Sequence, residues 1–309
     1  MPSWDAVGIG VAVRDISVRL DQFPQSDEKC QSLGTYESGG GPVPTALVTM
    51  TRLGRRTTFA GVVGEDSTGR FVLKGLEDEG VDLHWMQYRA ELTTPTSVIL
   101  VENGRRTILE PPRTSTGNGL PLDEALLDRL PLESCRCLLI DARSASVQLE
   151  AAKRVRAAGG LVVLDCGHPR PGVGSILAHT DIAILSHTYP KALNISNRDP
   201  AQFLEELHGN LPEDGPAIAG MTLGEDGCML KTAAHPPQHL PGQSVRAVDT
   251  TGAGDVFHGA FVHAYLDTGS AEIAGRFANA CAAGKCEGMT GRAPIPPADE
   301  LWRRARSAP

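Results

Sequence analysis

Short apolar runs alternate with amphipathic stretches along most of this chain of 309 residues, and the alternation restricts its fold more than any other feature. The apolar runs span residues 6–13, 58–63, 137–140, 161–164, 181–185 and 217–221. The amphipathic stretches include residues 42–53, 69–79, 147–158 and 173–178. Strands separated by helices pair in parallel, because each helix returns the chain to the same edge of the sheet. The pattern therefore predicts an α/β domain whose helices cover both faces of a largely parallel sheet.

Two stretches interrupt this alternation. Residues 17–36 show no helical period. Residues 94–109 alternate like a strand and contain Asn103-Gly104, a dipeptide typical of tight hairpins. From the pattern alone, both stretches could form a small β-layer beside the main sheet, or they could be edge strands and long loops.

One helix is delimited by its own terminal residues. Asp199 can cap the first turn, Pro200 suits the first helical position, and Gly209 permits a left-handed end. We therefore expect a helix over 200–208 that serves as scaffold.

The overall composition excludes several functional classes. The net charge is −8 and no long face concentrates Lys or Arg, so nucleic acid is not an expected partner. No apolar run approaches the roughly 20 residues that span a bilayer, and the first residues do not resemble a signal peptide. The seven cysteines fall at irregular spacings, which favours free thiols in a reducing compartment over a metal site. We expect a cytoplasmic protein with no membrane or nucleic-acid partner.

The segment 249–255, with the sequence DTTGAGD, carries most of the chemical information. A strand is expected before it, at 245–248, and a helix after it. The small residues Gly252, Ala253 and Gly254 let successive backbone N–H groups converge at a helix N-terminus, which favours an anion. Asp255 then lies in the first helical turn, with its carboxylate beside the anion.

A carboxylate beside a phosphate-binding turn suits phosphoryl transfer. A hydroxyl must lie in line with the γ-phosphorus of ATP and lose its proton as the new bond forms, and Asp255 can accept that proton. The amides of residues 252–254 can stabilise charge on the migrating group. The simpler alternative is a Gly-rich turn followed by a capping Asp, but the full DTTGAGD string is much more specific than such a turn.

This string resembles the signature of the ribokinase family of sugar kinases, also called the PfkB family, and the resemblance covers nearly all of the chain. It implies a ribokinase-like three-layer α/β/α fold, with a mostly parallel central sheet and a small β-sheet lid. One domain would span residues 1–309, with lid segments at about 16–37 and 94–112. The implied activity is transfer of the γ-phosphoryl group from Mg²⁺-bound ATP to a sugar hydroxyl.

The resemblance also implies site residues. Asp15, which we expect at the carboxyl end of the first strand, would accept sugar hydroxyls together with the turn Gly39, Gly40 and Gly41. The ATP site would include Thr222, Gly224, Gly227 and Asn279, although Asn279 could also be an ordinary amide on a helix surface. Pro44, Ser186 and Tyr189 depart from the family pattern. The sugar contact that relatives make at position 44 is therefore absent, and Mg²⁺-bound ATP is still expected although the pattern does not identify the protein's contact to Mg²⁺.

Two further properties follow from the resemblance alone. Asp249 and Thr251, with carbonyl groups near residues 288–292, resemble a monovalent cation site, which K⁺ would fill. Lids of relatives pair into dimers, and the lid would expose Val98 and Leu100, so we expect a homodimer through the lid.

Within the family, the chain resembles the sulfofructose kinases over residues 39–42, 249–260, 285–286, 291–293 and 295–296. On this resemblance, Arg143 and Lys29 would contact an anionic ketohexose, and a guanidinium is well suited to a sulfonate, phosphate or carboxylate. Glu110 stands where an Asn is expected and would oppose an anion unless it pairs with a nearby arginine. Two other hypotheses stay open: a nucleoside kinase of the same superfamily, and a non-catalytic sugar or nucleotide sensor.

Overall fold

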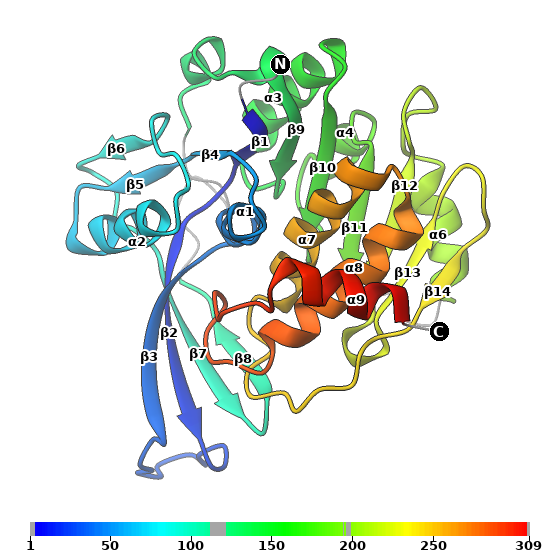
Figure 1. Cartoon of the computed structure of the whole chain (residues 1–309). Helices are drawn as coiled ribbons and strands as arrows, with labels where there is room; N and C mark the ends of the chain where they lie inside the picture. The colour runs from blue at the N-terminus through cyan, green and yellow to red at the C-terminus, as the bar shows by residue number, and fades with distance from the viewer. Residues whose placement is uncertain (1–3, 112–121, 194, 196–198, 308–309) are drawn as a thin grey trace.

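The computed structural model describes residues 4–111, 122–193, 195 and 199–307, and in these residues the main sheet has eight strands (Figure 1). Their order is β14 (Gln238–Leu240), β13 (Cys228–Lys231), β12 (Ile218–Thr222), β11 (Ile182–Ser186), β10 (Leu161–Cys166), β9 (Cys135–Ile140), β1 (Trp4–Ile9) and β4 (Thr57–Ala60). The six strands from β12 to β4 run parallel, and β13 and β14 add antiparallel pairs at one edge. The predicted, mostly parallel sheet is thus confirmed.

Helices cover both faces of this sheet, because successive residues of a strand point to opposite sides. On β9, Leu138 and Ile140 join the core beneath one helical layer, whereas Cys137 and Leu139 join the core beneath the other. The first layer comprises α3 (Ala145–Ala157), α4 (Val173–Leu177), α5 (Tyr189–Ala192) and α6 (Pro200–His208). The second comprises α1 (Pro42–Arg52), α2 (Ser67–Asp78), α7 (Ala253–Thr268), α8 (Ala271–Lys285) and α9 (Ala298–Ser307).

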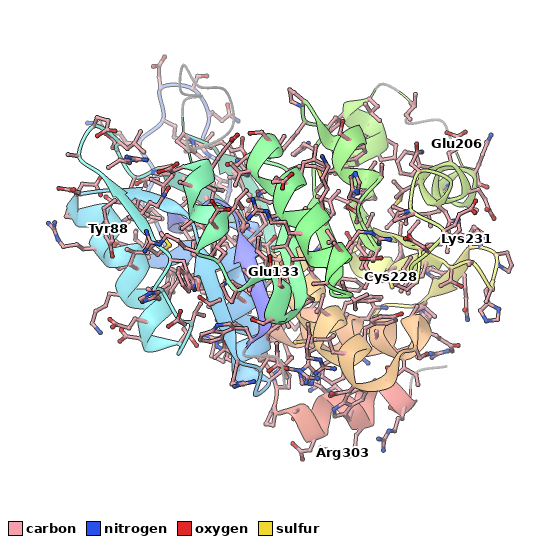
Figure 2. The ribbon with its side chains drawn as sticks, turned by 90° about the horizontal axis from the view of Figure 1, so that it is seen from above. Tyr88, Glu133, Glu206, Cys228, Lys231 and Arg303 are labelled. Carbon is pink, nitrogen blue, oxygen red and sulfur yellow. The ribbon has the colours of Figure 1, made fainter. Side chains whose placement is uncertain are left out.

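The view from above separates these layers, with α3 and α4 in green on one side and α7 to α9 in orange and red on the other, where Arg303 is labelled (Figure 2). Three short 3₁₀ helices, η1 (Glu124–Asp128), η2 (Leu132–Ser134) and η3 (Gly224–Asp226), connect elements of the part of the chain that the structure describes. Among the described residues, no helix is both long enough and apolar enough to cross a bilayer.

A second sheet projects from the main body as a lid (Figure 1). Its strand order is β3 (Gly34–Gly40), β2 (Val13–Leu20), β7 (Thr96–Glu102) and β8 (Arg105–Leu109). The turn between β7 and β8 has Asn103 at φ 49° and Gly104 at φ 77°, as a tight hairpin requires. The lid is confirmed, although it extends to residues 13–15 and 38–40, and residue 112 of the expected lid lies outside the described residues. A short pair, β5 (Val62–Gly64) and β6 (Gln87–Arg89), lies beside α2.

Several expected elements differ in extent or conformation. The run 6–13 is divided between β1 and β2, and the run 58–63 is divided at Gly61 between β4 and β5. Residues 245–248 form no strand, and only the next residue, Asp249, makes an isolated bridge, to Gly104. Gly209 has φ −64°, so α6 ends without the left-handed residue that we predicted.

Candidate active site

The N-terminus of α7 lies where the carboxyl ends of the parallel strands meet the lid (Figure 1). Gly252 precedes the helix at φ 70°, a left-handed conformation, and a Cβ there would lie 2.7 Å from the carbonyl oxygen of Gly291. Only glycine fits this position without strain. Ala253 and Gly254 then open the helix, and Asp255 lies in its first turn as predicted, where free backbone N–H groups favour an anion.

The Asp255 carboxyl is more basic than an ordinary aspartate. Burial raises its pKa, and the positive charges of His258, Arg106, Lys285 and Arg143 offset only part of that effect. A raised pKa brings a general base closer to neutral pH, where proton transfer is more efficient. Arg106 comes from lid strand β8 and also donates from Nη1 to the hydroxyl of Thr250, at 3.1 Å, so the lid contacts the loop that leads into α7.

Asp15 is buried on β2 of the lid. We expected it at the carboxyl end of the first strand of the main sheet, so this prediction of its position is wrong. Burial raises its pKa to about 7, with a further increase from Asp255 and a partial offset from Arg292 and Ser97. The chain leaves β1 at Ile9 and enters the lid at Val13, after residues 10–12 pass along the start of α1, where Gly10 lies close to Val43. The structure therefore brings Asp15 and Asp255 together from opposite parts of the fold.

Each of the three glycines of the predicted sugar-binding turn lies where a side chain would clash, and the clashing group differs at each position. A Cβ on Gly40 would lie 2.0 Å from Oδ2 of Asp15, and a Cβ on Gly39 would lie 2.3 Å from Nη1 of Arg292. Gly41 has φ 102° and would press a Cβ to 2.1 Å from the carbonyl oxygen of Val11. This turn therefore approaches the Asp15 carboxylate and the Arg292 guanidinium as closely as a backbone can.

The lid face that carries Asp15 is polar. Asp15 pairs in register with Ser38 on β3 and Ser97 on β7, so these three side chains share a face. Ser17, two residues along β2, lies on the same face. The hydroxyl groups of Ser17 and Ser38 are buried and make no hydrogen bond within the described part of the chain. Buried hydroxyls beside a carboxylate suit a ligand that has several hydroxyl groups.

Arg143 follows β9 and belongs to a cluster of charged side chains. Its Nη2 lies 3.8 Å from Oε1 of Glu110, and its Nε lies 3.9 Å from Oδ2 of Asp141. Burial lowers the pKa of Arg170, and the positive charge of Arg143 lowers it further. Cationic side chains of this kind suit an anionic group of a substrate. In the structure, Glu110 lies beside Arg143 instead.

Lys29 does not join this site. It is exposed in the loop 21–33 at the outer end of the β2–β3 pair, whereas Asp15 lies near the opposite end of β2 (Figure 1). The expectation that Lys29 contacts the substrate together with Arg143 finds no support in this geometry.

The expected ATP residues lie beyond the carboxyl end of β12. Thr222 ends β12, and the backbone of Leu223 donates to the carbonyl oxygen of Gly227 at 2.7 Å, which closes a tight turn over Gly224. Gly224 and Gly227 have φ 69° and 91°. Asn279 is buried, and its Nδ2 donates to the carbonyl oxygens of Leu240 and Pro241 at 3.0 and 3.1 Å. Asn279 therefore holds the adjacent backbone and is not an amide on a helix surface.

The residues present suit a Mg²⁺ ion that arrives with phosphate. Tyr189 is buried in the core against Phe203, with 6.3 Å between ring centroids, and burial raises its pKa to about 12. Within the described residues, no group of three or more His, Cys, Asp or Glu side chains could hold a metal ion. Mg²⁺ is commonly held by substrate phosphates, water and one or two carboxylates, and such binding needs no cage of side chains.

The residues that resemble a K⁺ site do not suit a K⁺ ion. The ammonium group of Lys285, on α8, donates from Nζ to the carbonyl oxygens of Asp249, at 2.8 Å, and of Thr251. A cation of the protein itself therefore occupies the position where we expected K⁺.

The sequence did not identify three candidate site residues, Asp165, His258 and Arg292. Asp165, near the end of β10, and His258, one turn after Asp255 on α7, approach to 3.2 Å between Oδ2 and Nδ1. The signal for Asp165 was its place at the carboxyl end of a parallel strand, where α/β proteins bind ligands. Arg292 was not identified because the sequence around it does not indicate that its side chain is buried.

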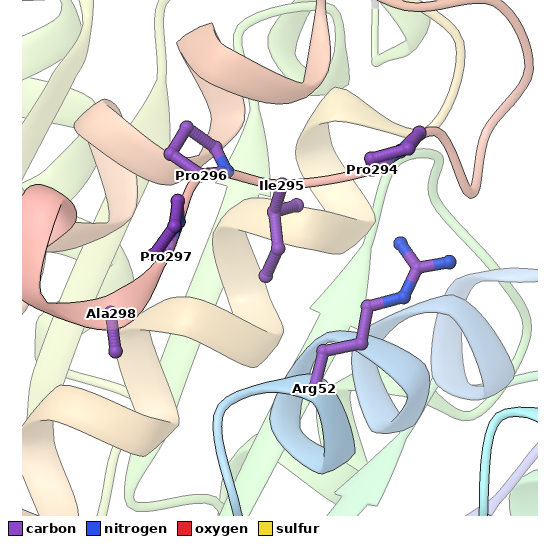
Figure 3. A pocket seen from close by; sticks show the side chains of 6 residues that line it. All are labelled: Arg52, Pro294, Ile295, Pro296, Pro297 and Ala298. Atoms are coloured by element: carbon purple, nitrogen blue, oxygen red, sulfur yellow. The ribbon is translucent and has the colours of Figure 1, made fainter.

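A cavity of about 330 Å³ lies outside this site, between Arg52 and the connection 294–298 (Figure 3). Arg52 donates to the carbonyl oxygens of Arg292 and Ala293, at 3.0 and 2.8 Å, and pairs with Glu79. Its contacts hold the backbone that places Arg292, so this side of the molecule supports the site.

Comparison with known proteins identifies the family. The model of the pfkB family of carbohydrate kinases matches residues 5–298. An ATP-dependent ribose-1-phosphate kinase of Halopiger xanaduensis is 27% identical, and the match covers 93% of both chains. A nucleoside kinase of Methanothermobacter thermautotrophicus is 25% identical, over 97% of this chain and 95% of the relative.

The fold is shared with solved structures. Arabidopsis thaliana ribokinase, complexed with ribose and ATP, matches with a TM-score of 0.80 and 22% identity, over 99% of both chains. The ribokinase-like fold that the sequence predicted is thereby confirmed. With the family model matching almost the whole chain, this protein belongs to the pfkB family of carbohydrate kinases, phosphotransferases that act on an alcohol group.

Proposed function

We propose that this kinase transfers the γ-phosphoryl group of ATP to a hydroxyl of a sugar, with Asp255 as the general base. The observation that carries the proposal is the pair of carboxylates that the fold brings together, Asp15 and Asp255, in which burial and then the charge of Asp255 raise the pKa of Asp15. Only Asp255 stands at a helix N-terminus, where the phosphoryl group would bind. Asp15 lies among lid hydroxyls and would orient the sugar.

The geometry suggests one order of events. The acceptor hydroxyl gives its proton to the Asp255 carboxylate as its oxygen bonds to the γ-phosphorus, and the bond to the leaving oxygen of ADP breaks. The backbone N–H groups of residues 252–254 stabilise the negative charge on the migrating group. A Mg²⁺ ion that arrived with ATP would neutralise part of the phosphate charge.

We further propose that the acceptor is an anionic sugar, with a ketohexose such as sulfofructose as the first candidate. Arg143 and Arg170 form the cationic end of the site, and Glu110 would leave Arg143 when the anion of the substrate binds. A guanidinium binds sulfonate, phosphate and carboxylate through paired N–H groups, so the chemistry supports the whole class of anionic sugars.

A nucleoside acceptor is the second candidate. Tyr36 pairs with Ser17 in register and is therefore on the substrate face of the lid, where an aromatic ring could stack on a base. The relative described as a nucleoside kinase supports this alternative.

The lid also supports a proposed homodimer. Its second face is apolar, because Ile16, Val98 and Leu109 pair in register across three strands. Leu109 is 54% exposed. Val98 and Leu100, which we expected to be exposed, are half-buried. An exposed apolar face is commonly covered by a partner. Sedimentation velocity would test the proposal, and a monomer at micromolar concentration would contradict it.

An ADP-release assay with a panel of neutral sugars, sugar phosphates, sulfofructose and nucleosides tests the function. The Asp255→Asn variant should bind ATP and sugar with near-normal affinity and lose kcat by roughly 10²–10⁴-fold, because the proton acceptor is removed. A near-normal rate would refute the role of Asp255. If no acceptor releases ADP, the protein is a sensor and not an enzyme.

A further inference from the structure

Lys285 is the most deeply buried cationic side chain near the active site. It lies in the last turn of α8 and has no solvent exposure. Its Nζ donates to the backbone carbonyl oxygens of Asp249 and Thr251. An ammonium group has three donors and no acceptor, so carbonyl oxygens are suitable partners for it.

Burial lowers the pKa of Lys285, and the negative charge of Asp249, which is also fully buried, opposes that shift and favours the ammonium form. The Asp249 carboxylate accepts from the backbone N–H of Thr251 at 2.8 Å, through Oδ1, and of Thr290 at 2.9 Å, through Oδ2. A buried charge is tolerated when it is hydrogen-bonded and has an opposite charge nearby, and both conditions hold for Lys285. The hydrogen bonds of Asp249 and Lys285 together join the two loops 249–251 and 286–290.

A K⁺ ion could not share these oxygens. Carbonyl oxygens bind K⁺ by replacing its water shell, and here two of them already bind an ammonium group. A second cation beside Lys285 would also be repelled in a buried, weakly screened environment. We propose that the ammonium group of Lys285 is a built-in monovalent cation, which makes this enzyme independent of K⁺.

The function of this built-in cation follows from its place in the chain. The carbonyl group of Thr251 immediately precedes Gly252, whose left-handed conformation turns the next N–H groups towards the phosphoryl site. The backbone N–H groups of Val248 and Asp249 donate to the carbonyl oxygen of Cys286, at 2.7 and 3.2 Å, so the end of α8 holds this loop on both sides. Lys285 is therefore a positioning residue for the anion-binding turn, and it need not contact substrate.

The first test uses the wild-type protein. We expect kcat to be the same when K⁺, Na⁺ or tetramethylammonium is the sole monovalent cation. We also expect no binding of Tl⁺, a K⁺ mimic, by thallium NMR, and this readout needs no substrate. A large loss of kcat in tetramethylammonium, or Tl⁺ binding that disappears in Asp249→Asn, would overturn the proposal even if the assumed acceptor were wrong.

The second test opens the site. Lys285→Ala should lower kcat by about 100-fold in tetramethylammonium, because the anion-binding turn loses its support. K⁺, or ethylamine as a replacement for the missing side chain, should restore much of the rate and raise the melting temperature. Lys153→Ala, at an exposed position of α3, is the matched control and should respond to neither. A folded Lys285→Ala variant with wild-type kcat in tetramethylammonium would refute the positioning role, and an unfolded one leaves the wild-type cation test to decide.

Discussion

His258 and Asp165 form a buried pair behind the proposed general base, with 3.2 Å between Nδ1 and Oδ2. Nδ1 of His258 also lies 2.7 Å from the carbonyl oxygen of Gly254, and Nε2 lies 2.9 Å from that of Ile184. Carbonyl oxygens only accept hydrogen bonds, so each ring nitrogen faces an acceptor. Burial raises the pKa of Asp255, one helical turn away, and positive charge on His258 opposes that rise.

Substitutions in this pair should move the pH profile in opposite directions. His258→Gln removes a positive charge, so the pKa of Asp255 should rise and the acidic limb of the kcat profile should move to higher pH. Asp165→Asn removes a nearby negative charge, so the limb should move to lower pH. At neutral pH we expect His258→Gln to lose about tenfold in kcat. Circular dichroism would confirm folding, and limbs that move in the same direction would contradict the electrostatic coupling.

The raised pKa of Asp15, about 7, predicts how pH affects substrate capture. In the free enzyme Asp15 takes up a proton as the pH falls through 7, and a protonated carboxyl no longer accepts two hydroxyl groups. We therefore expect kcat/KM to fall below pH 7. Bound sugar hydroxyls donate to the carboxylate and lower its pKa, so the limb of kcat should lie at lower pH than that of kcat/KM. Coincident limbs would argue against Asp15 as the sugar contact.

The same group predicts a dependence of stability on pH. Its folded-state pKa of about 7 lies above the usual 3.8, so the contribution of Asp15 to stability is largest below pH 4 and is lost as the pH rises to 7. Asp15→Asn cannot ionise, so the variant should melt at a higher temperature than the wild type above pH 7. The two proteins should converge near pH 4. Melting curves without sugar would show this, and a variant that is less stable at pH 8 would contradict it.

Arg143 and Glu110 should influence anionic substrates in opposite ways. Arg143→Ala should raise KM by about 10–100-fold for an anionic sugar and little for a neutral one, because a charged hydrogen bond is lost. Glu110→Gln should lower KM for the anionic sugar, since the competing carboxylate is gone. Arg129→Ala, at an exposed position, is the control. Equal effects of Arg143→Ala on the KM of both sugars would show that this arginine has a structural role and does not contact the anion.

Two glycines within helices should respond oppositely to the same substitution. A Cβ on Gly259 of α7 would lie 2.3 Å from the carbonyl oxygen of Ala46 on α1, so Gly259→Ala should destabilise the protein by about 1–3 kcal/mol or more. Gly75 of α2 has no atom within 4 Å of such a Cβ, and Gly75→Ala should stabilise the protein by about 0.5–1 kcal/mol. Each kcal/mol should move the melting temperature by about 2–4 °C. Shifts of the same sign would contradict the close packing of α1 on α7.

The sequence alone determined the features that depend on local chemistry. Periodic apolar residues predicted the parallel sheet and its helices, Asn103-Gly104 predicted the lid hairpin, and the string 249–255 predicted Asp255 in the first turn of a helix. Each of these depends on residues close together in the chain, so a short window contains the necessary information. Gly209 shows the limit of such windows, because a residue that permits a left-handed conformation is not required to adopt it.

Tertiary structure alone decided which side chains meet. Lys285 looks like an ordinary lysine at the end of a helix, yet packing places its ammonium group where we expected K⁺. Asp15 lies outside the main sheet because the apolar run 6–13 is divided between β1 and lid strand β2, a division that hydrophobicity does not reveal. Asp165 and His258 are 93 positions apart by their numbers and meet only because β10 and α7 pack together. Contacts of this kind depend on strand order and burial, and no local pattern encodes either one.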